Sequence, residues 1–273
     1  MSAPSNRGRF VPATLVVLSL LGLALPLVFG TTRADDRRDA DGNAAPPASA
    51  ALPASIRILD LPPRIAPPFA PSAPASRSAA RVLETLGRVR AGVRSTRYQH
   101  NTVVRERDGL FAWDCSGMAA WVLRRSAPGA MRVITRGRPV ARDFVRAIES
   151  APIGRSRAGW QRLASVSEAL PGDLFAWRRP RGFPSRNTGH VGFVVNAPVT
   201  VPSMPGAFAV RIADATSLGH QDDSRRDDPD GGFGVGTIVF LTDASGHGTH
   251  YGWFGTESEG YVVTPIVMGR VTR

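Results

Sequence analysis

The sequence predicts an α+β fold in which helices come first and an antiparallel β-sheet follows. Residues 78–93 and 114–125 carry apolar side chains at helical spacing, which predicts two helices. Further along, short apolar runs typical of strands occupy residues 173–178, 190–195, 208–215, 236–243 and 249–254. The last two runs are separated only by "ASGHG", a plausible hairpin connection. Helices followed by consecutive strands favour an antiparallel sheet with helices on one side.

The chain divides by composition into three parts. Residues 1–30 combine early arginines with a long apolar run, which predicts an export signal or an N-terminal membrane anchor. Residues 31–78 are rich in Ala, Pro and Ser and predict a disordered linker, because such a segment buries too little apolar surface to offset its ordering entropy. Residues 79–273 are then the folded domain. We therefore expect an exported protein of the periplasm or cell envelope.

The positive charge of the chain comes from arginine alone. The formal net charge is +12, and the sequence contains no lysine. Most of this charge is expected on a solvated surface, where it would favour an anionic cell envelope. An exported protein rarely meets nucleic acid, so we expect no nucleic-acid partner.

Cys115 is the only cysteine of the chain and lies at the start of a predicted helix. Thiols of exported proteins are normally paired in disulfides, so a single thiol is buried and inert, joined to another molecule, or kept as a nucleophile. The free N–H groups at a helix N-terminus favour a thiolate, which predicts a lowered pKa for Cys115. His190 begins the glycine-flanked strand "GHVGFVV" and is the best candidate for its base.

Three motifs in order resemble the NlpC-type cell-wall peptidases, a papain-like bacterial group. They are "DCSG" at 114–117, "PGDL" at 171–174 and "GHVGFVV" at 189–195. The resemblance implies a papain-like fold, with N-terminal helices packed on an antiparallel sheet and the catalytic cysteine at a helix N-terminus. It also implies a cysteine peptidase or amidase that hydrolyses amide bonds in the peptide stems of peptidoglycan.

The same resemblance assigns roles to individual residues. Cys115 matches the nucleophile and His190 the base, and Asp214 stands where many members carry the histidine that orients the base. His220 is the alternative to Asp214 as this third residue. Tyr98 resembles the tyrosine near the oxyanion region, and the expected substrate-binding residues are Tyr98, Asp114 and Ser116. No metal and no cofactor is expected.

The sequence departs from the family pattern mainly by insertions. One lies between Cys115 and His190 and another, "NAPVTVPSMPGAFA", separates His190 from Asp214. Insertions beside a cleft set its shape, so the amide bond that is cleaved stays open. Two alternatives also stay open: a thiol acyltransferase or other amidase, and a catalytically inactive envelope-binding module. We expect a monomer whose partner is peptidoglycan or a related envelope amide.

Overall fold

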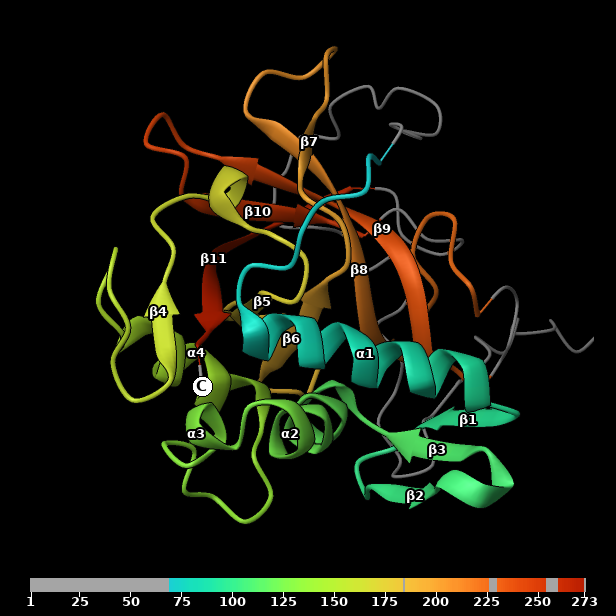
Figure 1. The fold of residues 1–273 in the computed structure, drawn as a ribbon. Coiled ribbons are helices and arrows are strands. Elements are labelled where there is room, and N and C mark those ends of the chain that lie inside the picture. The colour runs from blue at the N-terminus through green and yellow to red at the C-terminus, as the bar shows by residue number, and fades with distance from the viewer. Residues whose placement is uncertain (1–68, 184, 226–229, 254–259, 273) are drawn as a thin grey trace, which may run out of the picture. The chain divides into compact units, whose positions relative to one another are not determined.

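The structure is a computed structural model that describes residues 69–183, 185–225, 230–253 and 260–272 (Figure 1). The predicted signal or anchor at residues 1–30 and most of the predicted linker lie outside the described residues. Among the helices that are described, none combines the length and apolar character that crossing a membrane requires.

Six strands form a closed antiparallel barrel. Their order is β10-β9-β8-β6-β5-β11, and β11 pairs back with β10, which closes the ring. The strands are β5 (Leu174–Arg178), β6 (Gly189–Val194), β8 (Ala207–Thr216), β9 (Gly232–Thr242), β10 (Gly248–Gly252) and β11 (Tyr261–Val271). β10 has an irregularity between Gly248 and His250 in both of its pairings, and such a bulge helps a strand to bend around a barrel.

The closed barrel shows that the predicted papain-like α+β fold is wrong. The described part of the chain is mostly β, and its helices lie outside a closed barrel instead of on one face of an open sheet. The prediction failed at β11, which was not recognised as a strand because Pro265 and Gly269 interrupt its pattern. Without β11 the predicted strands had no partner that could join β10 to β5.

Side chains along the barrel strands point alternately to the inside and to the outside of the barrel, and both surfaces are buried. On β5, Phe175 and Trp177 belong to a hydrophobic cluster to which all six barrel strands contribute, and this cluster fills the interior of the barrel. Leu174 and Ala176 belong instead to the cluster shared with the helices. Burial on both faces explains why these strands read as continuous apolar runs in the sequence.

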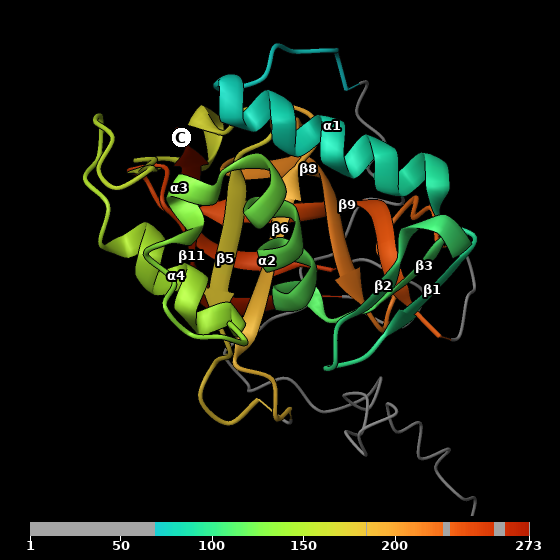
Figure 2. The same cartoon turned by 60° about the horizontal axis from the view of Figure 1, so that its bottom comes forward.

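Both predicted helices are present, and two shorter ones follow. They are α1 (Arg77–Gly92), α2 (Cys115–Ser126), α3 (Pro128–Met131) and α4 (Ala141–Glu149). Figure 2 shows α2 in front of β6 and α4 beside β5, and residue contacts confirm both placements. α1 begins two residues before the predicted domain, with the Ser76 hydroxyl accepting a hydrogen bond from the N–H of Ala79 at 3.0 Å.

A small separate sheet leads the chain into α2. It has the order β1-β3-β2 and consists of β1 (Ser95–Tyr98), β2 (Val103–Arg105) and β3 (Leu110–Trp113). β3 ends at Trp113, which is fully buried. The packing of Trp113 therefore fixes the backbone just before Asp114 and Cys115, where α2 begins. The insertion between Cys115 and His190 contributes α3, α4, β4 (Trp160–Arg162) and a 3-10 turn at Val166–Glu168, and the second insertion contributes β7 (Val199–Thr200).

The described end of the predicted linker contacts the barrel. The Ser76 hydroxyl donates to the carbonyl of Val271 at 2.6 Å, and the N–H of Ala75 donates to the carbonyl of Pro171 at 3.2 Å. These contacts join the segment before α1 to the end of β11 and to the turn that precedes β5.

Candidate functional site

Cys115 is the first residue of α2, as the sequence predicted. Asp114 caps the helix, and its Oδ1 accepts a hydrogen bond from the N–H of Gly117 at 2.6 Å. Gly117 is required at this turn, because a Cβ there would lie 2.3 Å from the Thr102 hydroxyl oxygen. The cap therefore fixes the backbone around the thiol.

The thiol is buried, and its pKa is raised instead of lowered. Burial is the largest cause, and the negative charge of Asp114 adds to it. Backbone N–H groups of Val191 and Ser116 contact the sulfur and act in the opposite direction. The predicted lowering of the Cys115 pKa by the helix N-terminus is wrong, and Cys115 is a neutral thiol at rest.

The sizes of the two effects explain why burial outweighs the helix N-terminus in setting the pKa of Cys115. Charges at a helix terminus are stabilised by about 0.3–2 kcal/mol, and one pKa unit corresponds to about 1.4 kcal/mol, so the helix can lower the pKa of a thiol by roughly one. Full burial of an ionisable group shifts its pKa by up to about 3–5. At 5% exposure, Cys115 lies in the range where burial dominates.

β6 carries His190 next to the residue whose N–H contacts the thiol. His190 is buried at 8% exposure, and Val191 follows it directly. Gly189 precedes it with φ of 142°, and a Cβ there would lie 1.9 Å from the carbonyl oxygen of Trp177. The glycine thus lets β6 approach β5 closely at the position where the histidine enters the site. The Trp177 ring lies 5.0 Å from the imidazole, centroid to centroid.

His190 is bonded to Asp214 on the neighbouring strand β8. The distance from Nε2 of His190 to Oδ2 of Asp214 is 2.7 Å. Burial lowers the pKa of His190, although the hydrogen bond and the charge of Asp214 oppose this. When Nε2 donates to the carboxylate, Nδ1 of the neutral ring holds the lone pair that can accept a proton.

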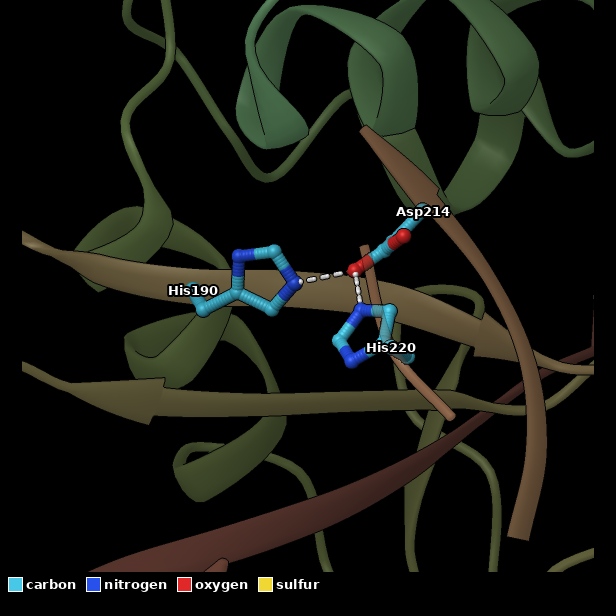
Figure 3. Close-up of side chains that lie close together, drawn as sticks. All are labelled: His190, Asp214 and His220. Carbon is cyan, nitrogen blue, oxygen red and sulfur yellow. Dashed lines mark hydrogen bonds and ion pairs between the residues drawn. The ribbon is translucent and has the colours of Figure 1, made fainter. Parts of the chain in front are cut away.

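Asp214 is shared by two histidines and one arginine. Figure 3 shows both imidazoles turned with Nε2 toward the same carboxylate oxygen, and His220 makes this contact at 2.7 Å. Nη2 of Arg225 donates to the other oxygen at 2.8 Å. Burial alone would raise the pKa of Asp214, but the charges of His220 and Arg225 and the two hydrogen bonds outweigh it, and this pKa lies well below its usual range.

A loop holding Asp223 and Arg225 is packed against glycines of β9. Asp223 accepts hydrogen bonds from Nε and Nη2 of Arg225, at 2.9 and 2.6 Å, and from the N–H of His220 at 2.8 Å. A Cβ on Gly234 would lie 2.5 Å from Nε of Arg225, and one on Gly236 would lie 2.7 Å from Asp223. The alternating glycines of "GGFGVGT" therefore create the space in which this loop lies.

Asp214 and its two histidines are also the one group in the described ranges whose spacing suits a metal. The ligand atoms of His190, Asp214 and His220 all lie within 4.8 Å of one another. Each histidine, however, already lies at hydrogen-bonding distance from the carboxylate, and Arg225 places a positive charge on its other oxygen. This geometry is that of a hydrogen-bonded array.

The predicted substrate-binding residues lie at the start of α2 and at the end of β1. The Ser116 hydroxyl is buried and donates to Oδ1 of Asp114 at 2.8 Å, and Oδ2 of Asp114 lies 3.2 Å from Nδ1 of His100. The Tyr98 hydroxyl accepts a hydrogen bond from Asn187 at 3.3 Å. The roles of Tyr98, Asp114 and Ser116 toward a substrate remain predictions.

A cavity of about 620 Å³ lies in the insertion that follows Cys115. Its lining includes Arg136, Arg146, Arg157 and Trp160, but neither Cys115 nor His190. The insertion therefore builds a hollow of its own apart from the thiol.

The sequence analysis named Cys115, His190, Asp214 and His220 but missed Arg225 and Asp223. His220 was considered only as a replacement for Asp214, whereas Asp214 lies between the two histidines. The glycine alternation on β9 is the signal in the sequence that could have indicated a loop packed on that strand. No known protein family, curated protein or solved structure matches this chain.

Proposed function

We propose that the chain is a cysteine amide hydrolase in which Cys115 is the nucleophile, His190 the base and Asp214 the residue that orients the base. The observation that carries the proposal is the buried His190–Asp214 contact of 2.7 Å, on the strand whose next N–H contacts the thiol. A buried imidazole with one nitrogen fixed by a carboxylate, and a thiol held against the same strand, supports a nucleophile–base pair.

The reaction starts from a neutral pair. Cys115 is a thiol and His190 is an uncharged imidazole, because burial disfavours the charged form of both. The proton of the thiol moves to Nδ1 of His190 as sulfur attacks the amide carbon. The imidazolium then gives this proton to the departing amine, which leaves a thioester on Cys115. Water hydrolyses the thioester with His190 again as the base.

Asp214 stabilises the imidazolium that forms during each step. Its carboxylate holds the Nε2 proton of His190 and is already ionised, since its pKa lies well below the usual range. The same contact fixes the ring orientation, which keeps Nδ1 available as the proton acceptor.

For the substrate, we propose an amide bond in a peptide stem of peptidoglycan. The support is the ordered occurrence of "DCSG", "PGDL" and "GHVGFVV", which resembles the NlpC-type peptidases. Export and an arginine-rich surface would place such an enzyme at an anionic envelope.

The test is mass spectrometry of purified muropeptides after incubation with wild-type protein and with Cys115→Ala. We expect the wild type to release fragments with a new amine and a new carboxylate, and Cys115→Ala to release none. His247→Gln is the matched control, because His247 is an exposed histidine of the β9–β10 hairpin.

Three other outcomes would overturn the proposal. Equal cleavage by Cys115→Ala would remove the thiol from the reaction. A released amine without a free acid, with the acyl group found on an added acceptor, would indicate an acyltransferase. Retention on peptidoglycan without any product would indicate a binding module.

A further inference from the structure

The insertion between Cys115 and His190 holds half of the net charge of the chain. Residues 132–162 contain eight arginines and two acidic residues, so they carry +6 of the total of +12. One of the two acids, Glu149, is bonded to Arg178 on β5, outside this segment. The positive charge is therefore concentrated in the insertion, and the acid that remains to balance it there is Asp143.

This charge surrounds the cavity of about 620 Å³ described above. Arg136, Arg146 and Arg157 line the cavity, and Asp143 is the one acidic residue among the described residues of its lining. Three guanidiniums and one carboxylate leave the lining with a net charge of +2. All three arginines are exposed, so a ligand entering from solvent can reach them.

One face of α4 forms a wall of the cavity. Spacings of three and four residues place side chains on the same side of a helix. The lining residues from α4 and its C-terminal end follow this spacing, and they are Asp143, Arg146, Ala147, Ser150 and Ala151. Phe144 and Ile148 point to another side of α4 and belong to the core cluster shared with the barrel. The cavity thus lies along the side of α4 that faces away from the barrel.

The three guanidiniums are arranged along this face of α4. Nε of Arg136 lies 3.2 Å from Oδ2 of Asp143, and Nη1 of Arg146 lies 4.0 Å from Oδ1. Arg157 donates from Nη2 to the carbonyl of Ser150, which is one helical turn beyond Arg146. These contacts use one nitrogen of each side chain, whereas a guanidinium has five N–H donors on three nitrogens. An anion in the cavity can therefore accept from arginines that are already positioned.

The turn that carries Arg157 has an unfavourable backbone conformation. Ala158 has φ of 52° and Gly159 has φ of 85°, and hydrogen bonds of 2.8 and 3.0 Å between the backbones of Arg157 and Trp160 close the turn. A Cβ disfavours such a φ, so alanine is unusual here. The turn is nevertheless fixed on α3, because Nε1 of Trp160 donates to the carbonyl of Ala130 at 2.7 Å. Backbone strain held in place by its surroundings is common at ligand-binding sites.

We propose that this cavity binds a ligand that carries a phosphate monoester group. Such a group has close to two negative charges near pH 7, which matches the +2 of the lining, and its oxygens suit the paired donors of arginine. The volume lies in the range of small-molecule sites and has room for more than the phosphate. The apolar side chains of Val133 and Ile134 can contact the remainder of the ligand.

The proposal does not depend on the proposed function. Neither Cys115 nor His190 lines the cavity, so the ligand binds apart from the thiol and takes no part in its chemistry. Cys115→Ala should therefore bind the ligand as the wild type does. Absence of muropeptide cleavage and absence of phosphate binding are then separate results.

The first test is isothermal titration calorimetry of the full chain with four probes. Glucose 1-phosphate is a monoester, dimethyl phosphate has one charge, malonate is a dicarboxylate and glucose has no charge. We expect glucose 1-phosphate to bind about 10–100-fold more tightly than dimethyl phosphate or malonate, and glucose not to bind. Equal binding of malonate would replace phosphate by a dicarboxylate, and equal binding of dimethyl phosphate would show that one charge is enough; either result overturns the proposal.

Glycerol 3-phosphate distinguishes two sources of the monoester. Tighter binding of glucose 1-phosphate than of glycerol 3-phosphate indicates a phosphorylated sugar, and the reverse indicates a glycerol phosphate such as the head group of a lipid. Both results support a phosphate site. Binding of neither compound contradicts it.

Substitutions locate the site. Arg136→Gln and Arg157→Gln should each weaken binding of glucose 1-phosphate by about 10–100-fold, the loss expected for a hydrogen bond to a charged group. Arg88→Gln is the matched control, because it removes the same charge from an exposed arginine on α1. It should change the affinity by less than about twofold, since salt screens a distant charge. Equal losses in all three variants would show general attraction to a basic protein.

A footprint on the wild-type protein gives the same answer without a variant. Phenylglyoxal modifies accessible arginines, and mass spectrometry of the digested protein reports the extent of modification at each one. Glucose 1-phosphate should protect Arg136, Arg146 and Arg157 and leave Arg88 unprotected. Uniform protection, or protection of none of the three, would overturn the proposal.

Discussion

Two of the aspartate–histidine pairs among the described residues differ sharply in their surroundings. His190 and Asp214 lie 2.7 Å apart with side chains 10% and 0% exposed. His247 and Asp243 lie 3.2 Å apart in the hairpin between β9 and β10, with side chains 53% and 45% exposed. The same two residue types are thus buried in one of these pairs and exposed to water in the other.

The difference shows that the surroundings of an aspartate–histidine pair decide how strongly its two side chains interact. Asp243 uses Oδ1 to accept from the backbone N–H groups of Ser245 and His247, so it shapes a turn. Around it, water screens the charge. Asp214 has two imidazoles and a guanidinium in place of water, and each of its contacts acts at a low local dielectric.

The largest expected difference between the pairs is in Asp214→Asn against Asp243→Asn. Asparagine keeps the size of Asp214 but removes the charge that stabilises the imidazolium, so we expect kcat to fall by about 100–1000-fold. Because the variant also leaves Arg225 with only Asp223, the free energy of unfolding should drop by about 3 kcal/mol. Asp243→Asn should change neither quantity measurably.

Steady-state kinetics and urea unfolding measure both effects. An Asp214→Asn protein with wild-type kcat would show that His190 needs no carboxylate. Equal losses in the two variants would show that burial does not distinguish the pairs.

The second-largest expected effect is a loss of stability when a glycine of β9 is replaced where the loop of Asp223 and Arg225 packs. Gly234→Ala would bring a Cβ to 2.5 Å from Nε of Arg225, so the loop must shift, at a cost of about 1–3 kcal/mol in unfolding free energy. Gly87→Ala on α1 is the control, because no atom lies within 4 Å of its new Cβ. This control should gain about 0.5–1 kcal/mol. Thermal unfolding of both variants measures the effect, and a neutral Gly234→Ala would mean that the loop is not held against β9.

The smallest expected effect is a change with pH in the stability difference between wild type and Asp214→Asn. The pKa of Asp214 is lowered by folding, so its contribution to stability is complete above the unfolded value of about 3.9 and is lost as pH falls through the folded value. The difference in unfolding free energy between wild type and Asp214→Asn should therefore be constant from about pH 5 to 7 and shrink below about pH 4. Unfolding in urea at several pH values checks this, and a difference that grows in acid would contradict the sign.

A site residue could be predicted from the sequence only where its own position and its neighbours in the chain indicated a role. A single thiol before a helix and a histidine between glycines at a strand start pointed to Cys115 and His190. The thiol pKa could not be predicted, because burial depends on how β6 and α2 pack. Arg225 and Asp223 were missed because they lie in a polar loop, and only the fold shows that this loop covers Asp214.

The fold was predictable locally but not globally. Periodicity found both longer helices and most barrel strands, because each buries apolar side chains at its own period. Closure depended on one strand with a proline inside it, and pairing between distant segments leaves no mark on local composition.

The place of β11 in the barrel has a consequence for how the protein is made. β11 pairs with both β5 and β10, so residues 261–271 are needed before the ring can close. On a ribosome, β5, β6 and β8 emerge while their ring is still open, with edges that can pair with other chains. Cys115, His190 and Asp214 are thus synthesised before the strand that closes the barrel, so the barrel around them is complete only after the end of the described chain has been made.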